Sequence, residues 1–440
     1  MSRLAYLAGW QSRLVFWGGA LLVGLSAVVF IKACAWALAV HTSLITHWPL
    51  LGLAVTPFGL ALLAFLTRKV FSGSQGSGIP QVIASLDIAD EKDRGALLSL
   101  RIAFAKILLT ILGMLAGASI GREGPMVHIG ASLMDAMGRW SRVPFQAMQR
   151  ALILAGGAAG IAAVFNTPIA GIVFAVEELA RSFEERTTGT LLTAVVIAGV
   201  VSTALLGNYI YFGKAVVHLP SASSWLAVPL CGIAGGLLGG LFSRLLISFG
   251  QHLLPLSKEH PVALAFGLGC IIAMIGLLSH GSTYGTGYQE ARDLLMTGHA
   301  PQLLFPIYKL LATLLSYLTG IPGGIFSPSI STGAGLGADL GLLLPQVPMA
   351  AMIILGMVGY FTGVTQSPMT GAVIVMEMVD DHGLILPILA TAFIAAGASK
   401  LVCSKAIYQA LAETFLPTIK PAQPAAEQVA QTALVESNLK

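Results

Sequence analysis

Residues 117–130 read GASIGREGPMVHIG and lie between two long apolar runs. Arg122 and Glu123 stand between glycines in this stretch and are followed by Pro125. A carboxylate set this deep in apolar sequence is costly unless it has a partner or a function. Glycines let backbone amides approach a ligand closely, and proline suits the first turn of a helix. The stretch therefore predicts a broken helix whose N-terminus faces a negative group. The alternative is a Gly/Pro kink with a structural Arg–Glu pair.

The composition is that of a membrane protein. Hydrophobic residues make up 56% of the 440 residues and charged residues only 10%, against about 25% charged residues in soluble proteins. The mean hydropathy of +0.83 indicates several membrane spans. The net charge of +4 is too small to indicate nucleic acid as a partner. The four cysteines are far apart and form no CxxC or Cys/His cluster, so we expect neither a metal site nor a cofactor.

The first apolar run extends from about residue 14 to residue 40 and has no small-residue cleavage pattern, so it is interpreted as a retained span. Segments 14–31 and 50–67 lack Asp, Glu, Lys and Arg, and each is just long enough to cross a bilayer. Basic residues stand before the first segment and after the second: Arg3, Arg13, Arg68 and Lys69. This asymmetry predicts a cytoplasmic N-terminus. We expect a protein of the cell (inner) membrane with both termini in the cytoplasm.

Several later uncharged runs are interrupted by Gly, Pro and Ser, as at Gly320 to Pro328. Lipid-exposed backbone does not tolerate such breaks, so they are expected to face protein or a water-filled cavity. The polar strip from Asp87 to Arg94 predicts a cytoplasmic turn. Residues 417–440 are predicted to be a short polar cytoplasmic tail that is too short to fold alone, and no separate soluble domain is expected.

The chain contains an internal repeat. Residues 166–177 (NTPIAGIVFAVE) match residues 366–377 (QSPMTGAVIVME), and the region of Pro125 and Gly130 matches that of Pro328 and Gly333. The matched positions include the sparse Pro, Gly and Glu residues. We therefore predict two membrane repeats, residues 1–213 and residues 214–416. Paired interrupted segments indicate a transport site at the repeat interface, built from opposed helix N-termini that select anions. The matches do not show whether the repeats are parallel or inverted.

Three motifs resemble the signature motifs of the CLC chloride channel and transporter family, in the family's order. They are GSGIP at 76–80, GREGP at 121–125 and GGIFSP at 323–328. The resemblance extends over nearly the whole chain, to about Leu416. It implies an all-α polytopic membrane protein with two inverted-repeat halves of tilted and broken helices. It also implies a homodimer with one anion pathway per subunit, which would move chloride and protons across the lipid bilayer.

The same resemblance implies roles for individual residues. Glu123 corresponds to the gating glutamate at the external side. Glu178 corresponds to the internal proton-transfer glutamate that exchangers carry and many channels lack. A serine at position 77, rather than proline, favours chloride over nitrate. The chloride-binding groups would be two side-chain hydroxyls and three backbone amides, those of Ser77, Tyr408, Gly324, Ile325 and Phe326.

The chemistry of these residues agrees with an H+/Cl− antiporter, which is not an enzyme. A charged Lys or Arg at the site would hold an anion too tightly for turnover, whereas partial charges on hydroxyls and amides let it leave. An ionised carboxylate can occupy the place of the anion, and a protonated one can leave it. That competition would couple proton movement to anion movement. Lys106 and Arg122 are expected to add positive electrostatic potential along the path, or to pair structurally.

Two features depart from the family pattern. His128 stands where a neutral polar residue such as Gln is expected, and a titratable group there would alter the pH dependence. The residues after Pro80 are Gln81, Val82 and Ile83, where some relatives have acidic residues on the internal proton route.

Several alternatives remain open on the sequence. A passive voltage- or pH-gated chloride channel is the main one, and in it Glu178 would form a structural pair with Arg181. Tyr408 could be an interfacial aromatic residue. Glu177 and Glu377 occupy matching repeat positions and are expected to be structural. Residues 117–121 also fit GxSxG, so an intramembrane serine protease is a distant alternative, with His128 as the only close histidine.

Overall fold

The computed structural model describes residues 3–88, 90–140, 146–181, 185–207, 209–215, 217–298, 302–381 and 383–415. These residues form helices joined by turns, with two isolated β-bridges and no strand among them. The predicted all-α class is confirmed. The predicted tail, residues 417–440, lies outside the described residues.

The first half begins with a 45-residue helix and continues in shorter ones. Its helices are α1 (Arg3–His47), η1 (Pro49–Leu51), α2 (Gly52–Phe65), η2 (Leu66–Val70), α3 (Ile79–Leu86), α4 (Glu91–Gly95), α5 (Leu100–Leu115), α6 (Glu123–Trp140), α7 (Gln146–Phe165), α8 (Pro168–Phe174), η3 (Ala175–Ala180) and α9 (Glu185–Leu206). Of these, η2 and η3 are π-helical. The predicted boundary between the repeats, after residue 213, falls in the connection that follows α9.

The second half repeats the order of the main helices. Its elements are η4 (Ala222–Leu226), α10 (Ala227–His252), α11 (Leu254–Glu259), α12 (Pro261–Leu278), α13 (Tyr288–Thr297), α14 (Phe305–Leu318), α15 (Phe326–Gly341), α16 (Met349–Thr365), α17 (Pro368–Val379), α18 (Ile385–Val402) and α19 (Ile407–Ala412). The predicted break around Gly320 to Pro328 is the irregular segment between α14 and α15.

Length and apolar composition mark seven helical segments of the described chain as able to cross a membrane. They are Val15–His47, Pro49–Val70, Glu91–Leu115, Met148–Phe165, Ala222–His252, Pro261–Leu278 and Ile385–Val402. Four further apolar helices, including Phe305–Leu318 and Met349–Thr365, are shorter. A multi-pass membrane protein with several incomplete spans is the result, as the interrupted apolar runs predict.

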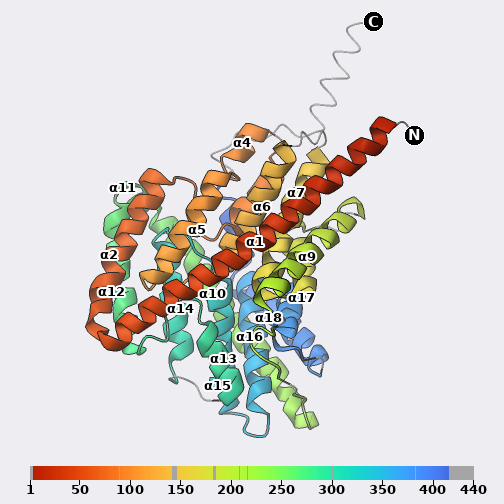
Figure 1. Ribbon diagram of the computed structural model, residues 1–440. Coiled ribbons are helices and arrows are strands. Elements are labelled where there is room, and N and C mark those ends of the chain that lie inside the picture. Colours follow the sequence, from red (N-terminus) through yellow and green to blue (C-terminus); the bar gives the residue numbers. More distant parts are fainter. Residues whose placement is uncertain are drawn as a thin grey trace, which may run out of the picture.

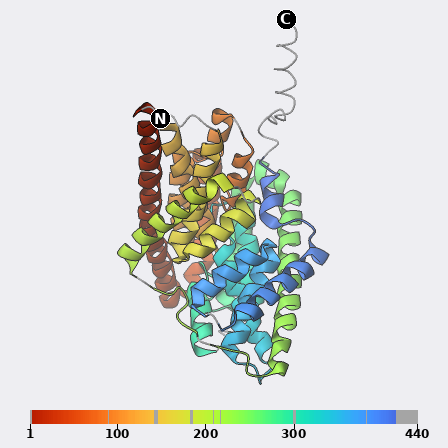
Figure 2. The ribbon, with the colours of Figure 1, turned by 90° about the vertical axis from the view of Figure 1, so that its right-hand side faces the viewer.

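The two halves run in opposite directions. In Figure 2 the long helix α1 starts at the top, near the N-terminus, whereas the long helix α10 on the opposite side of the molecule starts at the bottom and ends at the top. Figure 1 shows α1 crossing the face of the molecule in front of α5, α6 and α7. The repeat is therefore inverted, which the sequence matches alone leave open.

Close helix contacts are the same in both halves. A Cβ atom on Gly156 of α7 would overlap the carbonyl group of Gly130 in α6. In the second half, a Cβ atom on Gly333 of α15 would lie 2.6 Å from the carbonyl oxygen of Gly356 in α16. Small residues allow such close backbone approach between membrane helices. The matched glycines therefore hold α6 on α7 and α15 on α16, and they fix where α6 and α15 begin.

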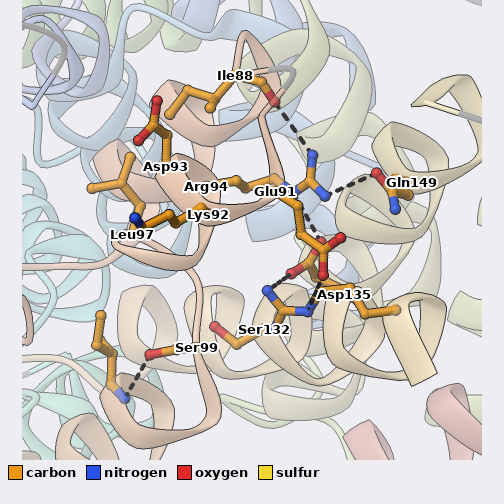
Figure 3. A network of polar contacts seen from close by, with 12 residues as sticks. Ile88, Glu91, Lys92, Asp93, Arg94, Leu97, Ser99, Ser132, Asp135 and Gln149 are labelled. Carbon is orange, nitrogen blue, oxygen red and sulfur yellow. Dashed lines mark hydrogen bonds and ion pairs between the residues drawn. The ribbon is translucent and has the colours of Figure 1, made fainter. Parts of the chain in front are cut away.

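A buried ionic network holds the predicted polar turn against the first half (Figure 3). This turn forms α4, whose N-terminal amides are capped by the Asp90 carboxylate. Arg94 donates from Nε to Asp135 of α6 (3.1 Å) and from Nη2 to Gln149 of α7 (2.8 Å). Arg139 also pairs with Asp135 (3.1 Å). A buried charge is tolerated when it is paired and hydrogen-bonded in this way, so the network ties α4 to both α6 and α7.

Candidate functional site

The starts of two helices meet at the centre of the molecule. The Gly121 amide donates to the Gly324 carbonyl (2.6 Å), and the Gly324 amide donates to the Gly121 carbonyl (2.8 Å). This antiparallel bridge lies just before α6 begins at Glu123 and just before α15 begins at Phe326. The prediction of opposed helix N-termini, one from each half, is confirmed.

The loop that carries Ser77 is held against the same junction. The Gly76 amide donates to the Ile321 carbonyl (3.2 Å), and the Gly76 carbonyl accepts from the Gly323 amide (3.3 Å). Gly78 precedes α3 with a φ of 101°, a conformation that favours glycine. A Cβ atom on Gly124 would overlap the Ser77 hydroxyl. The Ser77 side chain therefore lies against the first turn of α6.

Two hydroxyl groups at this junction are buried without partners. Ser77 and Tyr408 are both completely buried. Neither Ser77 Oγ nor the Tyr408 hydroxyl has a hydrogen-bond partner within the described part of the chain. The two residues come from loops and helices that meet, because α19 packs on α3. A buried hydroxyl without a partner costs about 1–3 kcal/mol, so each of these two groups is free to donate to an acceptor.

The three backbone groups expected to bind chloride differ from one another. The Gly324 amide is already engaged by the Gly121 carbonyl (2.8 Å), so in this conformation it is not available to an anion. Ile325 caps α15 and Phe326 is its first residue, where helical amides have no acceptor within the helix. The Phe326 ring packs on Phe361 with 4.4 Å between ring centroids. Apolar packing therefore fixes the start of α15.

Glu123 links the two helix starts directly. Its side chain is completely buried. The Ser327 hydroxyl donates to Glu123 Oε1 (2.6 Å), and the Ser327 amide lies 3.4 Å from Oε2. A carboxylate from the start of α6 thus occupies the N-terminus of α15, where the helix dipole favours negative charge. Ser327 lies inside the GGIFSP motif, but sequence reasoning assigned it no role.

Two buried lysines, one in each half, donate hydrogen bonds to backbone carbonyls of loops. Lys106 donates from Nζ to the carbonyls of residues 74, 75 and 76 (2.9, 3.2 and 3.0 Å). Lys309 of the second half donates to the carbonyls of residues 283, 284 and 285 (2.9, 3.5 and 2.9 Å). An ammonium group has three hydrogen-bond donors, so all three donors of each lysine are engaged by backbone carbonyls. Of the two roles predicted for Lys106, the structure favours structural pairing.

Glu178 lies in the π-helical segment η3 and is 1% exposed. One carboxylate oxygen accepts a hydrogen bond from the Ser367 hydroxyl, which comes from the second half, and the other oxygen has no partner in the described chain. Arg181 is exposed, and the described residues contain no ion pair between it and Glu178. Arg181 therefore acts on Glu178 only through longer-range electrostatic attraction and not through a direct ion pair. Ser367 is the second residue of the matched repeat segment 366–377, and sequence reasoning assigned it no role.

Glu177 and Glu377 have the structural role that their matching positions predict. Glu177 accepts hydrogen bonds from the amides of Met369 and Thr370 (3.1 and 2.6 Å) at the start of α17. Glu377 accepts from the amides of residues 169 and 170 (3.2 and 2.7 Å) at the start of α8. Each half therefore caps a helix of the other half, and this prediction is confirmed.

His128 is held in a neutral, fully bonded arrangement. Its Nε2 lies 2.8 Å from the Leu97 carbonyl, and its Nδ1 lies 3.4 Å from the Ser132 hydroxyl. With Nε2 as donor and Nδ1 as acceptor, both ring nitrogens of the neutral ring are satisfied. The ring therefore ties α6 to the turn at Leu97. Gln81, the other departure from the family pattern, donates to the Gln75 carbonyl (2.7 Å) and so braces the loop before Ser77.

The serine of the GxSxG stretch is hydrogen-bonded to residues of α14. The Ser119 hydroxyl lies 3.0 Å from the Thr313 hydroxyl, and the Ser119 amide donates to Ser316 Oγ (3.0 Å). No histidine of the described chain is hydrogen-bonded to Ser119. The described residues also contain no cluster of three His, Cys, Asp or Glu side chains that could hold a metal ion.

Comparison with known proteins agrees with this geometry. A structure described as a slow cyanobacterial Cl−/H+ antiporter is 26% identical, with a TM-score of 0.79 over 92% of this chain and 98% of that chain. A CLC-type fluoride/proton antiporter is 23% identical, with a TM-score of 0.77 over 93% and 99% of the two chains. A eukaryotic CLC transporter is 21% identical, with a TM-score of 0.73 over 92% of this chain and 74% of that chain. The latter two show likeness of fold.

The family model described as voltage gated chloride channel matches residues 58–400. That range includes the Ser77 loop, the junction of Gly121 with Gly324, and Glu178. The chain therefore belongs to the CLC family of chloride channels and transporters.

Proposed function

We propose that this protein is an H+/Cl− antiporter, and that its central chloride site is formed by the hydroxyls of Ser77 and Tyr408 with the amides of Ile325 and Phe326. The observation that carries the proposal is the pair of buried hydroxyls without partners. Chloride would accept from both and remove the cost of leaving them unpaired. The likeness to a Cl−/H+ antiporter of 26% identity supports chloride as the anion.

The site would bind chloride without a formal positive charge. Lys106 of α5 contacts the loop before Ser77, and its three donors are engaged by the carbonyls of residues 74–76. Hydroxyls and amides offer only partial charges, which hold an anion loosely enough for it to leave. Gly324 is left out of the proposed site because its amide is bonded to Gly121.

Glu123 is proposed as the gate. Its carboxylate is bonded to Ser327 at the N-terminus of α15, which is an attractive place for an anion. An ionised Glu123 would compete with chloride for that place, and a protonated Glu123 would lose its advantage there. Protonation and chloride occupancy would then be linked by differential affinity.

Glu178 is proposed as the internal proton-transfer residue. It is buried, has one unpartnered oxygen, and bonds to Ser367 rather than to Arg181. An unpaired acidic group inside a membrane protein is expensive and commonly marks a proton route. This favours the antiporter over a passive channel, which has no need of such a group.

The proposed orientation puts both termini in the cytoplasm of a cell with the protein in its inner membrane. The connection from α2 to α3 carries Arg68 and Lys69, and the connection before α12 carries Lys258, whereas the turn after α1 has neither Lys nor Arg. Basic residues concentrate on the cytoplasmic side. Accessibility of the 253–260 turn to an impermeant reagent in intact cells measures this orientation directly.

We also propose a homodimer whose interface is formed by α9 and α18. Both helices expose apolar side chains, including Val196, Val200 and Phe393, at 55%, 62% and 56%. Gly199 and Gly397 lie on them with open space where a Cβ atom would stand. Small residues on an exposed helix face allow a second helix to approach closely, and a two-fold interface uses the same patch on both subunits.

The chloride site is tested by removing each hydroxyl. Ser77→Ala and Tyr408→Phe should each weaken chloride binding by about tenfold or more, the value expected for one hydrogen bond to a charged group. Isothermal titration of the purified protein with chloride measures this. The control is Ser74→Ala, because the Ser74 hydroxyl in the same loop already donates to the Phe71 carbonyl (2.7 Å). Equal chloride affinity in Ser77→Ala and the wild type would remove Ser77 from the site.

Glu123→Gln is expected to abolish proton coupling while chloride flux persists. The amide mimics the protonated acid, so it neither competes with chloride as an anion nor carries a proton. Proteoliposomes with a chloride gradient and a pH electrode measure both fluxes. Glu377→Gln is the matched control, since that glutamate caps α8 and lies outside the proposed path. Uphill proton movement by the Glu123→Gln protein would contradict the assignment.

Glu178→Val separates the antiporter from the channel. We expect proton movement to stop and chloride flux to continue, because the two routes would share only the part near Glu123. Arg181→Ala should leave both fluxes intact, since no ion pair joins Arg181 to Glu178. Parallel chloride and proton flux assays on the same proteoliposomes distinguish the antiporter from the channel. Loss of both fluxes together in Glu178→Val would instead indicate a structural role.

Gly199→Trp is expected to convert the dimer into a monomer, because an indole ring on α9 would keep the second subunit away. The control is Gly267→Trp on α12, where a Cβ atom also meets open space but no interface is proposed. Chemical cross-linking in membranes, followed by light scattering of the purified protein, reports the state. A Gly199→Trp protein that remains a dimer would exclude this face.

A further inference from the structure

The N-terminus of α17 carries a serine hydroxyl that the helix itself does not use. Ser367 stands at the capping position before Pro368, where a serine side chain usually accepts a hydrogen bond from an amide of the first turn. Its side chain makes no such bond in the described chain. Glu177 of η3 accepts from the amides of Met369 and Thr370 instead (3.1 and 2.6 Å). The other half of the chain thus supplies the cap, and the Ser367 hydroxyl remains free to donate.

That hydroxyl donates to Glu178. The hydrogen bond runs from Ser367 Oγ to Glu178 Oε2, and the two residues are 3% and 1% exposed. The other carboxylate oxygen, Oε1, has no hydrogen-bond partner in the described chain. Burial keeps bulk water from replacing the serine, so this hydrogen bond fixes one oxygen of the acid and leaves the other for a proton.

The internal repeat provides a comparison within the same chain. Thr167 matches Ser367 and stands at the same capping position, before α8. There Glu377 supplies the cap, and the Thr167 hydroxyl is completely buried without a partner among the described residues. The residue that matches Glu178 is Met378, so this hydroxyl has no matching acid. A hydroxyl displaced from its cap is therefore common to both helix starts, and the one at Ser367 meets a titratable group.

A hydroxyl can bond to an acid in both of its protonation states. It donates to an ionised carboxylate, and its oxygen accepts from the O–H of a protonated one. A hydrogen bond to the ionised form is charge-assisted and roughly twice as strong as a neutral one. Such a bond therefore holds the carboxyl group in place while its proton is gained and lost, and it favours the ionised form.

Other ionisable groups surround Glu178 without a hydrogen bond to its carboxyl group in the described chain. The helices packed on η3 are α3, α7, α8 and α17, and α3 and α8 contain no charged residue. Arg150 of α7 donates to the Leu86 carbonyl (3.3 Å), and Glu377 of α17 caps α8. The remaining groups interact with Glu178 electrostatically or line the cavity that Ser367 also lines, and they are Glu177, Arg181, Tyr408, Lys400 and Lys405.

We propose that Ser367 is a positioning residue for proton transfer, whose hydroxyl holds the Glu178 carboxyl group in both protonation states and sets the pH at which Glu178 takes up a proton. Its importance for transport rests on the proposed function of Glu178, whereas its effect on protonation does not. Without the hydroxyl, the ionised form of Glu178 would lose the hydrogen bond that the structure shows. Glu178 would then bind its proton more tightly and release it at a higher pH.

The protonation of Glu178 can be measured without transport, by infrared difference spectroscopy of the purified full chain during a pH titration. The carbonyl band of the protonated acid is assigned to Glu178 by its absence in Glu178→Gln. Ser367→Ala should shift the midpoint of this band to higher pH by about one unit, because the ionised form loses the stronger hydrogen bond. Ser367→Thr keeps a hydroxyl at this position, as Thr167 does at the matched one, and should restore the wild-type midpoint.

Thr167→Ala is the matched control. Its hydroxyl has no partner in the described chain, so we expect the midpoint of the Glu178 band to stay at the wild-type pH. Chloride titration in a calorimeter reports whether each variant is folded. In proteoliposomes, the Ser367→Ala protein should reach half-maximal proton flux at a pH about one unit higher than the wild type on the side from which Glu178 takes up its proton.

Three results would overturn the inference: no titrating band of Glu178, an unchanged midpoint in Ser367→Ala, or an equal shift in Thr167→Ala. Failure of the proposed function has a different signature. If the midpoint shifts as expected but Glu178→Val still moves protons, the positioning by Ser367 stands and the proton-transfer role of Glu178 is refuted. If Glu178→Val stops proton flux while Ser367→Ala changes neither the midpoint nor the pH profile, the antiporter stands and the role of Ser367 is refuted.

Discussion

The pairing of Gly121 with Gly324 is the constraint on which the centre of the structure depends. Helices that break inside a membrane leave amides and carbonyls that lipid cannot satisfy. Here each broken segment of one half is completed by the other half. The Gly76 amide also donates to the Ile321 carbonyl, and the Gly285 amide donates to the Ala118 carbonyl, so further contacts join the two halves. The site therefore exists only when both halves are folded together, and neither repeat could present it alone.

A second constraint concerns the two buried lysines near the broken segments. At about 4 Å and an effective dielectric constant of about 20, a lysine would attract chloride by roughly 4 kcal/mol, which corresponds to about a thousandfold in affinity. Lys106 and Lys309 instead donate to three carbonyls each behind their loops. These hydrogen bonds hold the loops and leave the lysines no donor for an anion. In the proposed site, chloride would therefore meet only hydroxyls and amides, and its binding would stay weak.

Much of this architecture could be predicted from the sequence because it depends on local rules. The break before Pro125, the break before Pro328 and a structural role for Glu177 and Glu377 follow from Gly, Pro and the matched repeats, whereas the capping partners of the two glutamates do not. What could not be predicted depends on contacts between halves. The engagement of the Gly324 amide and the hydrogen bonds from Ser327 to Glu123 need the three-dimensional pairing of segments about 200 residues apart.

The length of the first helix is another feature that composition alone does not predict. The uncharged segment 14–31 ends at Lys32, yet α1 continues as one helix to His47. Lys32 is exposed on that helix, where a long side chain can extend its charge away from the apolar surface. A charge interrupts a hydropathy pattern without interrupting the helix. The added turns of α1 also line a cavity that Arg122 and Tyr288 border, so the longer helix has a structural consequence that the composition does not reveal.

The inverted repeat gives two similar halves, and a directional proton route needs a difference between them. That difference lies at one turn. Glu177 and Glu377 both cap a helix of the opposite half, but the residue after Glu377 is Met378, which is completely buried, whereas the residue after Glu177 is Glu178. The first half is π-helical at this turn and the second remains α-helical, and π turns are frequent at functional sites. The shared glutamate holds the halves together, so its neighbour is free to differ. In the proposed antiporter, one acidic side chain next to a cap that both halves share would therefore be enough to give the proton an internal transfer residue that the other half lacks.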